Sequence, residues 1–370
     1  MKKYIVGIIF VTLVILGLII WGGSNNTPAY DSKSIAVFSD THTYQTLKVE
    51  IDQYILDVQK DTGSVVKLFA DDFKKPEQVR NKLQEIYSQG LQGSILIGEV
   101  PIPYFESPGE FIGGGGNLLP SDRYYMDLES SDFIDEDNNG KYELEKYGGR
   151  YSKNLPDNLL WVGRIKSYGN DIELLRAYFQ RNHLYRTNKI NPVKSLLVYS
   201  MDTQSGPVGA TMAIYENNIK DSFFRTGLYS KEQVSLIVDT PKSVFLNEMS
   251  KSYETASINA HGNATSQQIG EGITPADIKN SKPKPYFYYL LSCVNGDFSK
   301  KDYLAGHYLL DGNGLVVIAH TIQALAGADE AKNYMAYLAQ GDNFGVAFVK
   351  VQKRVNEMHA TLIGDPTLKM

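Results

Sequence analysis

Apolar and polar residues follow two repeating patterns along the first half of the chain, and these patterns predict alternating strands and helices. Short apolar runs at residues 34–38, 65–69 and 94–100 predict strands. Between them, apolar residues recur every three or four positions, which is typical of helices with one packed face. Pro76 marks the start of the second helix and Gly90 its end. This alternation predicts a parallel sheet with helices on its faces.

A second series of the same kind follows a polar segment at residues 188–192. Its strands are predicted at residues 195–200, 234–238, 256–260, 286–292 and 315–319, and its helices at 212–224, 241–250, 329–339 and 344–357. Nearly continuous apolar runs such as these are typical of strands covered on both faces. The fold class is therefore α/β, with mostly parallel sheets flanked by helices. We divide the chain into subdomains at 34–187 and 188–370.

Residues 101–157 interrupt the pattern. They contain a glycine run at 113–116 and an acidic, polar stretch at 130–149. We expect a long loop region inserted in the N-terminal subdomain, with short strands at 124–128. A strand at 159–165 and a helix at 171–185 then complete that subdomain.

The N-terminus has the pattern of a membrane signal. Lys2 and Lys3 precede an uncharged apolar run at residues 4–21. This run is longer than the apolar part of most cleaved signal peptides, so we predict a transmembrane signal anchor at 1–24 and a linker at 25–33. The two lysines favour the cytoplasmic side. The rest of the chain is then anchored to the membrane on its extracytoplasmic side, and a secreted protein is the alternative.

Composition narrows the classes of function. Hydrophobic residues make up 42% of the 370 residues and charged residues 21%, which is enough apolar material for a large core. The net charge is -5 and no basic stripe is present, so nucleic acid is not an expected partner. The glycine run is not followed by Lys-Ser/Thr, so it is not a phosphate loop, and we expect no organic cofactor. The chain has 1 cysteine, which excludes an internal disulfide.

That cysteine lies at the end of a predicted strand. Cys293 follows the run at 286–292, and His261 follows the run at 256–260. The carboxyl ends of parallel strands meet at one edge of a sheet, so the two side chains come together if the strands are neighbours. The intervening segment has room for one crossover helix, and Thr274-Pro275 is a typical helix start.

A thiol beside an imidazole is the chemistry of a cysteine nucleophile with its base. His261 would activate Cys293 and then protonate the leaving amine. Gly262, without a side chain, would let its backbone N–H approach substrate and form an oxyanion hole with the N–H of Cys293. His320 follows the strand at 315–319, and we predict that it lines the substrate pocket at the same edge. The alternative for each of these residues is a purely structural role.

Six segments resemble the gingipain-type cysteine peptidases of the caspase-like clan. Two of them carry the proposed dyad, INAHG at 258–262 and LLSC at 290–293. The others are ILIGEVPIP at 95–103, SDRYYMDL at 121–128, LWVGRI at 160–165 and LIGDPTL at 362–368. The resemblance covers about residues 34–370. It implies a caspase-like fold of two side-by-side subdomains, with His261 as base, Cys293 as nucleophile, and Gly262 and Cys293 as oxyanion donors.

The acidic stretch contains a possible calcium loop. Asp135, Asp137 and Asn139 take the first, third and fifth positions, Gly140 the turn and Glu143 the ninth position. Lys146 stands at the twelfth position and cannot bind a cation, which excludes a full EF-hand. A shorter structural Ca²⁺ loop is the prediction, also because proteins resembling this one use structural calcium, and a solvated acidic turn is the alternative.

Together these features predict an extracytoplasmic cysteine endopeptidase that hydrolyses peptide bonds through a Cys293 thioester. Its partners would be protein or peptide substrates and, through the N-terminal segment, the membrane. The alternative is a catalytically inactive caspase-like surface protein that binds peptides or partner proteins. An α/β-hydrolase esterase is disfavoured because the chain has no Gly-x-Ser-x-Gly elbow.

Overall fold

The computed structural model describes residues 33–109, 117–146, 148, 156–201, 212–324, 329–355 and 358–370. The predicted signal anchor at 1–24 lies outside these residues, as does nearly all of the predicted linker. Across the described ranges, no helix combines the length and the apolar character needed to cross a bilayer.

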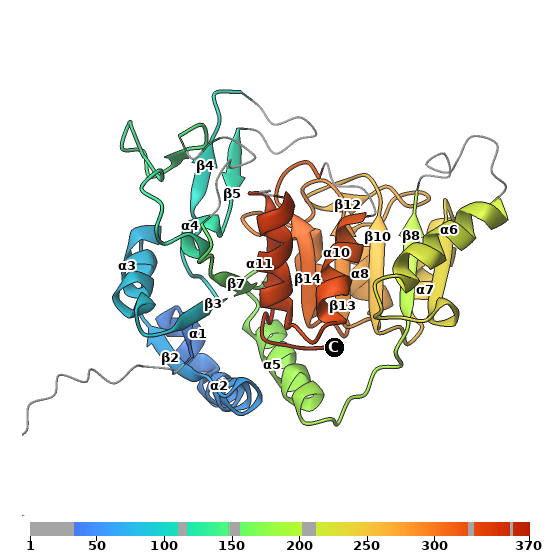
Figure 1. Cartoon of the computed structure of the whole chain (residues 1–370), viewed down its shortest axis with the longest axis horizontal. Coiled ribbons are helices and arrows are strands. Elements are labelled where there is room, and N and C mark those ends of the chain that lie inside the picture. Colours follow the sequence, from blue (N-terminus) through green and yellow to red (C-terminus); the bar gives the residue numbers. More distant parts are fainter. Residues whose placement is uncertain are drawn as a thin grey trace, which may run out of the picture. The chain divides into compact units, whose positions relative to one another are not determined.

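Ten strands form one sheet in the order β2-β1-β3-β7-β15-β14-β13-β10-β8-β9 (Figure 1). Their bounds are β1 Ser34–Ser39, β2 Val65–Ala70, β3 Leu91–Ile97, β7 Trp161–Ile165, β8 Leu196–Ser200, β9 Val234–Val238, β10 Thr255–Asn259, β13 Phe287–Leu291, β14 Val316–His320 and β15 Ala360–Gly364. Within this sheet, the neighbours β2, β1, β3 and β7 pair in parallel. The neighbours β14, β13, β10, β8 and β9 also pair in parallel. β15 lies between the two groups and is antiparallel to β14. The predicted α/β fold with a mostly parallel sheet is confirmed.

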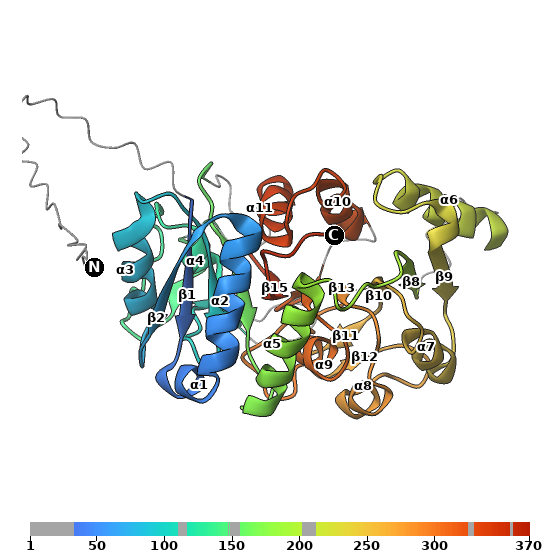
Figure 2. The same cartoon turned by 90° about the horizontal axis from the view of Figure 1, so that it is seen from below.

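Helices cover both faces of this sheet. They are α1 Thr41–Thr46, α2 Lys48–Thr62, α3 Pro76–Tyr87, α4 Arg123–Met126, α5 Ile172–Arg186, α6 Met212–Phe224, α7 Lys242–Met249, α8 Pro275–Ser281, α9 Leu304–Leu310, α10 Asp329–Leu338 and α11 Phe344–Val355. Figure 2 shows α10 and α11 on one face and α5, α9 and α8 on the other. The strands between these layers are apolar on both sides, and every residue of β13 and β14 is buried.

Two small sheets stand apart from the large one. One contains β4 Tyr104–Glu106, β5 Leu118–Pro120 and β6 Tyr142–Glu143. The other is a hairpin of β11 Gly262–Asn263 and β12 Ser266–Gln267, which begins directly after His261. The first lies in the segment that we predicted as a loop region, and the second belongs to the candidate site.

One local prediction was wrong. Residues 124–128 were expected as short strands, but the chain forms the helix α4 there, with Met126 and Asp127 donating to the carbonyls of Asp122 and Arg123. All four residues of α4 are buried. A short apolar run that is buried on every side has no clear period, so its pattern does not separate a strand from a helical turn.

The two predicted halves of the chain share one sheet rather than forming separate sheets. The N-terminal strands and the later strands lie on either side of β15, which pairs with both β14 and β7. The boundary that we placed at 187/188 falls between α5 and β8, and it stays a prediction.

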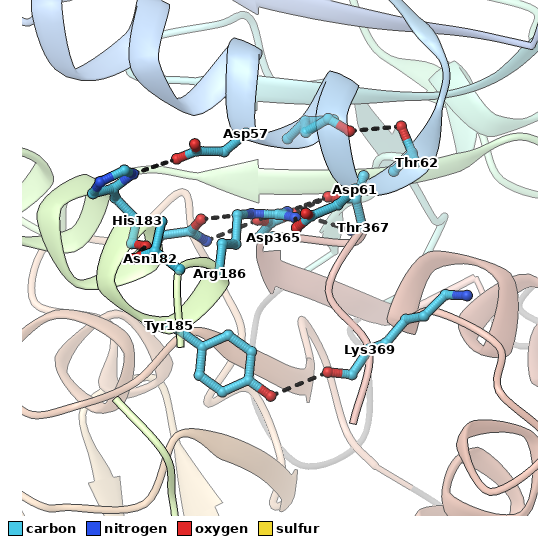
Figure 3. A network of polar contacts seen from close by, with 12 residues as sticks. Asp57, Asp61, Thr62, Asn182, His183, Tyr185, Arg186, Asp365, Thr367 and Lys369 are labelled. Atoms are coloured by element: carbon cyan, nitrogen blue, oxygen red, sulfur yellow. Dashed lines mark hydrogen bonds and ion pairs between the residues drawn. The ribbon is translucent and has the colours of Figure 1, made fainter. Parts of the chain in front are cut away.

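The segment after β15 is held by buried charges (Figure 3). Asp365 is fully buried and accepts hydrogen bonds from Arg186 at 2.6 Å and from Asn182 at 2.8 Å. Burial alone would raise the pKa of Asp365, but the Arg186 guanidinium and the hydroxyl of Thr367 bring it below its ordinary value. The Gly-Asp-Pro-Thr segment therefore ties β15 to α5.

Candidate active site

Strand pairing brings the two predicted reactive residues to one edge of the sheet. β10 and β13 are parallel neighbours, and Asn259 at the end of β10 pairs with Leu291 at the end of β13. His261 and Cys293 each follow these paired residues by two positions. The expectation that their strands are neighbours is confirmed. The crossover between them contains α8, whose N-cap Thr274 forms a capping box with Asp277, as predicted.

The turn after Cys293 is fixed by β14. Val294 has a φ of 62°, a left-handed conformation that β-branched residues rarely adopt. Its N–H donates to the carbonyl of Ile322 at 2.9 Å, and the N–H of Gly296 donates to the carbonyl of His320 at 2.8 Å. A Cβ atom on Gly296 would lie 2.9 Å from the Cβ of Ala319, so the turn packs tightly on the strand. The half-buried Cys293 thus begins a rigid turn.

His261 lies directly before the β11–β12 hairpin and is exposed. Its N–H donates to the Sδ atom of Met201 at 3.0 Å, and its carbonyl accepts from the N–H of Gln268 at 2.8 Å. A Cβ atom on Gly262 would lie 2.7 Å from the carbonyl oxygen of Ser266. Only glycine fits there without moving the backbone, and the predicted approach of the Gly262 N–H to substrate stays a prediction.

The structure brings the dyad residues to one edge but does not join their side chains. Within the part of the chain that the structure describes, the His261 imidazole and the Cys293 thiol form no hydrogen bond with each other. Catalytic hydrogen bonds are often long in ligand-free enzymes and tighten when substrate binds. The catalytic roles of His261, Gly262 and Cys293 therefore remain proposals.

A buried ion pair supports the turn from the N-terminal half. Arg164 of β7 donates to both carboxylate oxygens of Asp122, at 3.0 Å and 2.6 Å, and both side chains are buried. The Arg164 guanidinium lies over the ring of Phe298, with its Cζ atom 4.7 Å from the ring centroid. The segments at 121–128 and 160–165 thus meet beside the turn that carries Cys293.

His320 ends β14 at the predicted edge, and its predicted role in the substrate pocket stays a prediction. Its side chain is fully buried, with Nε2 at 3.1 Å from a carboxylate oxygen of Glu330. Burial alone would raise the pKa of Glu330, but His320 beside it lowers that pKa below its ordinary value. The pattern places His320 at the right edge, but α10 and the residues before β15 cover it. A structural role fits this position better than a lining of the substrate pocket.

The predicted calcium loop folds into a tight turn beside the small sheet. The carboxylate of Asp135 accepts hydrogen bonds from the backbone N–H groups of Asn139 and Gly140, at 3.0 Å and 2.9 Å. Gly140 has a φ of 83°, the conformation that such a turn needs. Asn139 uses its amide to hydrogen-bond Asp137 and Glu106.

The carboxylates nearest to one another in this region come from two strands and the loop. Oxygen atoms of Glu106, Asp137 and Glu143 all lie within 4.8 Å of one another. The Oε2 atom of Glu143 is buried and has no hydrogen-bond partner among the residues that the structure describes. Such a donor set fits Ca²⁺, which prefers oxygen ligands. Glu106 was not predicted, because it lies on β4, far from the loop in sequence, and no local pattern marks it.

A cavity of about 660 Å³ lies away from the proposed dyad. Ile35, Trp161 and Glu254, at the amino ends of β1, β7 and β10, contribute to its lining. The buried Arg186 that borders it is already paired with Asp61 and Asp365. The cavity thus faces the opposite edge from His261 and Cys293.

Solved structures share this arrangement. The crystal structure of gingipain R, an Arg-specific cysteine proteinase, superposes with a TM-score of 0.60 at 14% identity, over 94% of this chain and 80% of that one. This chain has the caspase-like gingipain fold. A complex of the pro- and mature domains of RgpB from Porphyromonas gingivalis gives a TM-score of 0.59 at 14% identity, over 92% and 80% of the two chains. The structure of another protease gives a TM-score of 0.57 at 13% identity, over 93% of this chain and 79% of that one.

No protein-family model and no curated protein matches the sequence. The likeness therefore rests on structure, and at these identities it establishes the gingipain fold alone. It agrees with the resemblance that we saw in six short segments. Because one fold supports many functions, the activity has to be argued from the site.

Proposed function

We propose that this protein is a cysteine peptidase in which Cys293 attacks a peptide carbonyl and His261 serves as base and then acid. The observation that carries the proposal is the pairing of β10 with β13, which sets His261-Gly262 and Cys293 at neighbouring strand ends on a gingipain fold. The thiol would form a thioester and expel the amine, which takes its proton from the imidazole. Water would then hydrolyse the thioester and regenerate the thiol.

The proposal is tested with peptide libraries and a thiol probe. The purified protein should cleave peptides, and Cys293→Ala should abolish cleavage. Because the chain has 1 cysteine, iodoacetamide reports on Cys293 alone. Its alkylation should be faster than that of a free thiol at neutral pH and should slow in His261→Ala. Cleavage that persists in Cys293→Ala would disprove the proposal.

A second candidate is a catalytically inactive surface protein that binds peptides or partner proteins. It fits the same fold, because one fold supports many functions and the likeness to gingipain R is one of fold alone. It predicts peptide binding without cleavage, and alkylation of Cys293 that is unchanged in His261→Ala. The same two measurements therefore separate the two candidates.

We further propose that residues 1–24 anchor the protein on the extracytoplasmic side of the membrane, with a secreted form as the alternative. The uncharged run after Lys2 and Lys3 supports this. A membrane-impermeant maleimide should label Cys293 in intact cells, and the labelled protein should sediment with membranes. Labelling only after lysis would contradict the orientation.

We also propose that Glu106, Asp137 and Glu143 hold a structural Ca²⁺ ion. The convergence of three carboxylates supports this site, as does the buried Oε2 atom of Glu143, which no described residue hydrogen-bonds. The ion would neutralise charges that otherwise repel one another and would link the loop to the small sheet.

A further inference from the structure

A buried amide joins the turn after Cys293 to the hairpin after His261. Asn295 is fully buried, and its Nδ2 atom donates to the carbonyl of Ser266 at 3.0 Å and to the carbonyl of Asn263. Both N–H bonds of the amide are used, and two carbonyl partners require nitrogen at this position. Since Asn263 and Ser266 lie on opposite strands of the hairpin, one side chain holds both strands.

A second buried amide connects the same two segments. The Nε2 atom of Gln267, in β12, donates to the hydroxyl of Ser292 at 3.0 Å, next to Cys293. Its Oε1 atom accepts from the hydroxyl of Tyr308 in α9 at 2.7 Å. The backbone of Gln267 pairs with Gly262 across the hairpin. Gln267 thus connects the residue before the thiol with the glycine after the imidazole.

The start of α9 adds backbone support. The N–H of Leu304 donates to the carbonyl of Ala264 at 2.8 Å, and the N–H of Ala305 donates to the carbonyl of Asn295 at 3.0 Å. The hairpin and the cysteine turn are therefore both tied to one helix. Strand pairing ends at Asn259 and Leu291, so these contacts decide how the two segments approach each other beyond the sheet.

We infer that Asn295 and Gln267 are positioning residues that hold the His261 hairpin against the Cys293 turn. The inference rests on the proposed function, since it concerns the alignment of that dyad. Neither side chain is exposed, so neither is placed to contact substrate. Loss of either contact should therefore weaken the influence of His261 on the thiol and lower kcat, with little change in KM.

The test follows the alkylation of Cys293 by iodoacetamide between about pH 5 and 9, together with peptide cleavage. Asn295→Asp keeps the shape of the side chain but replaces two donors with a carboxylate that faces two carbonyl oxygens. We expect its alkylation profile to move toward that of His261→Ala, and kcat to fall about 10²-fold with KM nearly unchanged. A profile and a kcat like those of the wild type would overturn the inference.

A matched control is Asn313→Asp. The Nδ2 atom of Asn313 also donates to a backbone carbonyl, that of Lys284 at 3.1 Å, but near the amino end of β13. This variant should behave like the wild type. If the wild-type profile itself does not depend on His261, the proposed dyad fails, which is a different outcome from a wild-type profile in Asn295→Asp.

Ser292→Ala covers the case in which Asn295→Asp does not fold. It removes only the hydroxyl that Gln267 binds and leaves the hairpin contacts of Asn295 in place. The alkylation profile should move in the same direction by a smaller amount. Unchanged alkylation and an unchanged kcat in a folded Ser292→Ala protein would then overturn the inference.

Discussion

At the scale of single residues, Gly262 has the least freedom in the candidate site. A side chain there would meet the carbonyl of Ser266 at 2.7 Å and the Nδ2 atom of Asn295 at 3.0 Å. The first neighbour is backbone and the second is held by two hydrogen bonds, so neither can move away cheaply. The backbone at Gly262, and with it the N–H of Gly262, would have to shift.

Gly262→Ala should therefore lower kcat/KM for peptide cleavage by about 10²- to 10³-fold, as the loss of one oxyanion donor does. Alkylation of Cys293 by iodoacetamide needs no oxyanion hole, so its rate should fall much less. Gly169→Ala is the control, because a Cβ atom there meets nothing within 4 Å. Equal losses in cleavage and alkylation would show that Gly262 does not act as a donor.

At the scale of elements, Arg186 of α5 pairs with two aspartates whose exposure to solvent differs greatly, and one of them directly follows β15. Arg186 pairs with the fully buried Asp365 and with Asp61, whose side chain is 38% exposed. Removing one partner of a buried pair leaves an uncompensated charge, whereas an exposed pair contributes little. Substitution of each aspartate therefore compares a buried and an exposed ion pair of the same guanidinium.

Asp365→Asn should lower the free energy of unfolding by about 3–5 kcal/mol at neutral pH. Asp61→Asn should lower it by about 1 kcal/mol or less. The pKa of Asp365 is lowered in the folded state, so its contribution is complete above the unfolded pKa of about 3.9 and is lost as pH falls through the folded value. Urea unfolding should show the difference between wild type and Asp365→Asn shrinking below about pH 4. Equal effects of the two substitutions would contradict this account.

The elements also show which parts of the site a sequence can predict. β10, β13 and α8 were predictable because apolar runs and a capping box are local signals. The clamp of Asn295 on Asn263 was not, because it joins residues 32 positions apart without any periodic pattern. His320 was placed at the correct strand end, but its burial depends on how α10 packs over that end, and a contact between distant elements leaves no local pattern.

At the scale of the whole molecule, the small sheet and the acidic loop form a satellite of the main sheet. Arg80 of α3 connects them to the body, since it donates to the carbonyls of Asp127 and Ser130. Tyr142 of β6 adds a hydrogen bond to Glu77 of α3 at 2.5 Å. Within the satellite, three carboxylates converge on one point, where their mutual repulsion opposes folding.

Calcium should therefore stabilise the whole protein, and EDTA should lower its Tm. A free Ca²⁺ concentration one hundred times Kd would add about 2.7 kcal/mol. Asp137→Ala and Glu106→Ala should each abolish the difference between calcium and EDTA, whereas Asp132→Ala, which removes an exposed carboxylate outside the group, should preserve it. The Glu106 variant is the sharper test, because a loop that binds Ca²⁺ on its own would not need a residue from β4. An equal EDTA effect in the wild type and in both site variants would exclude this site.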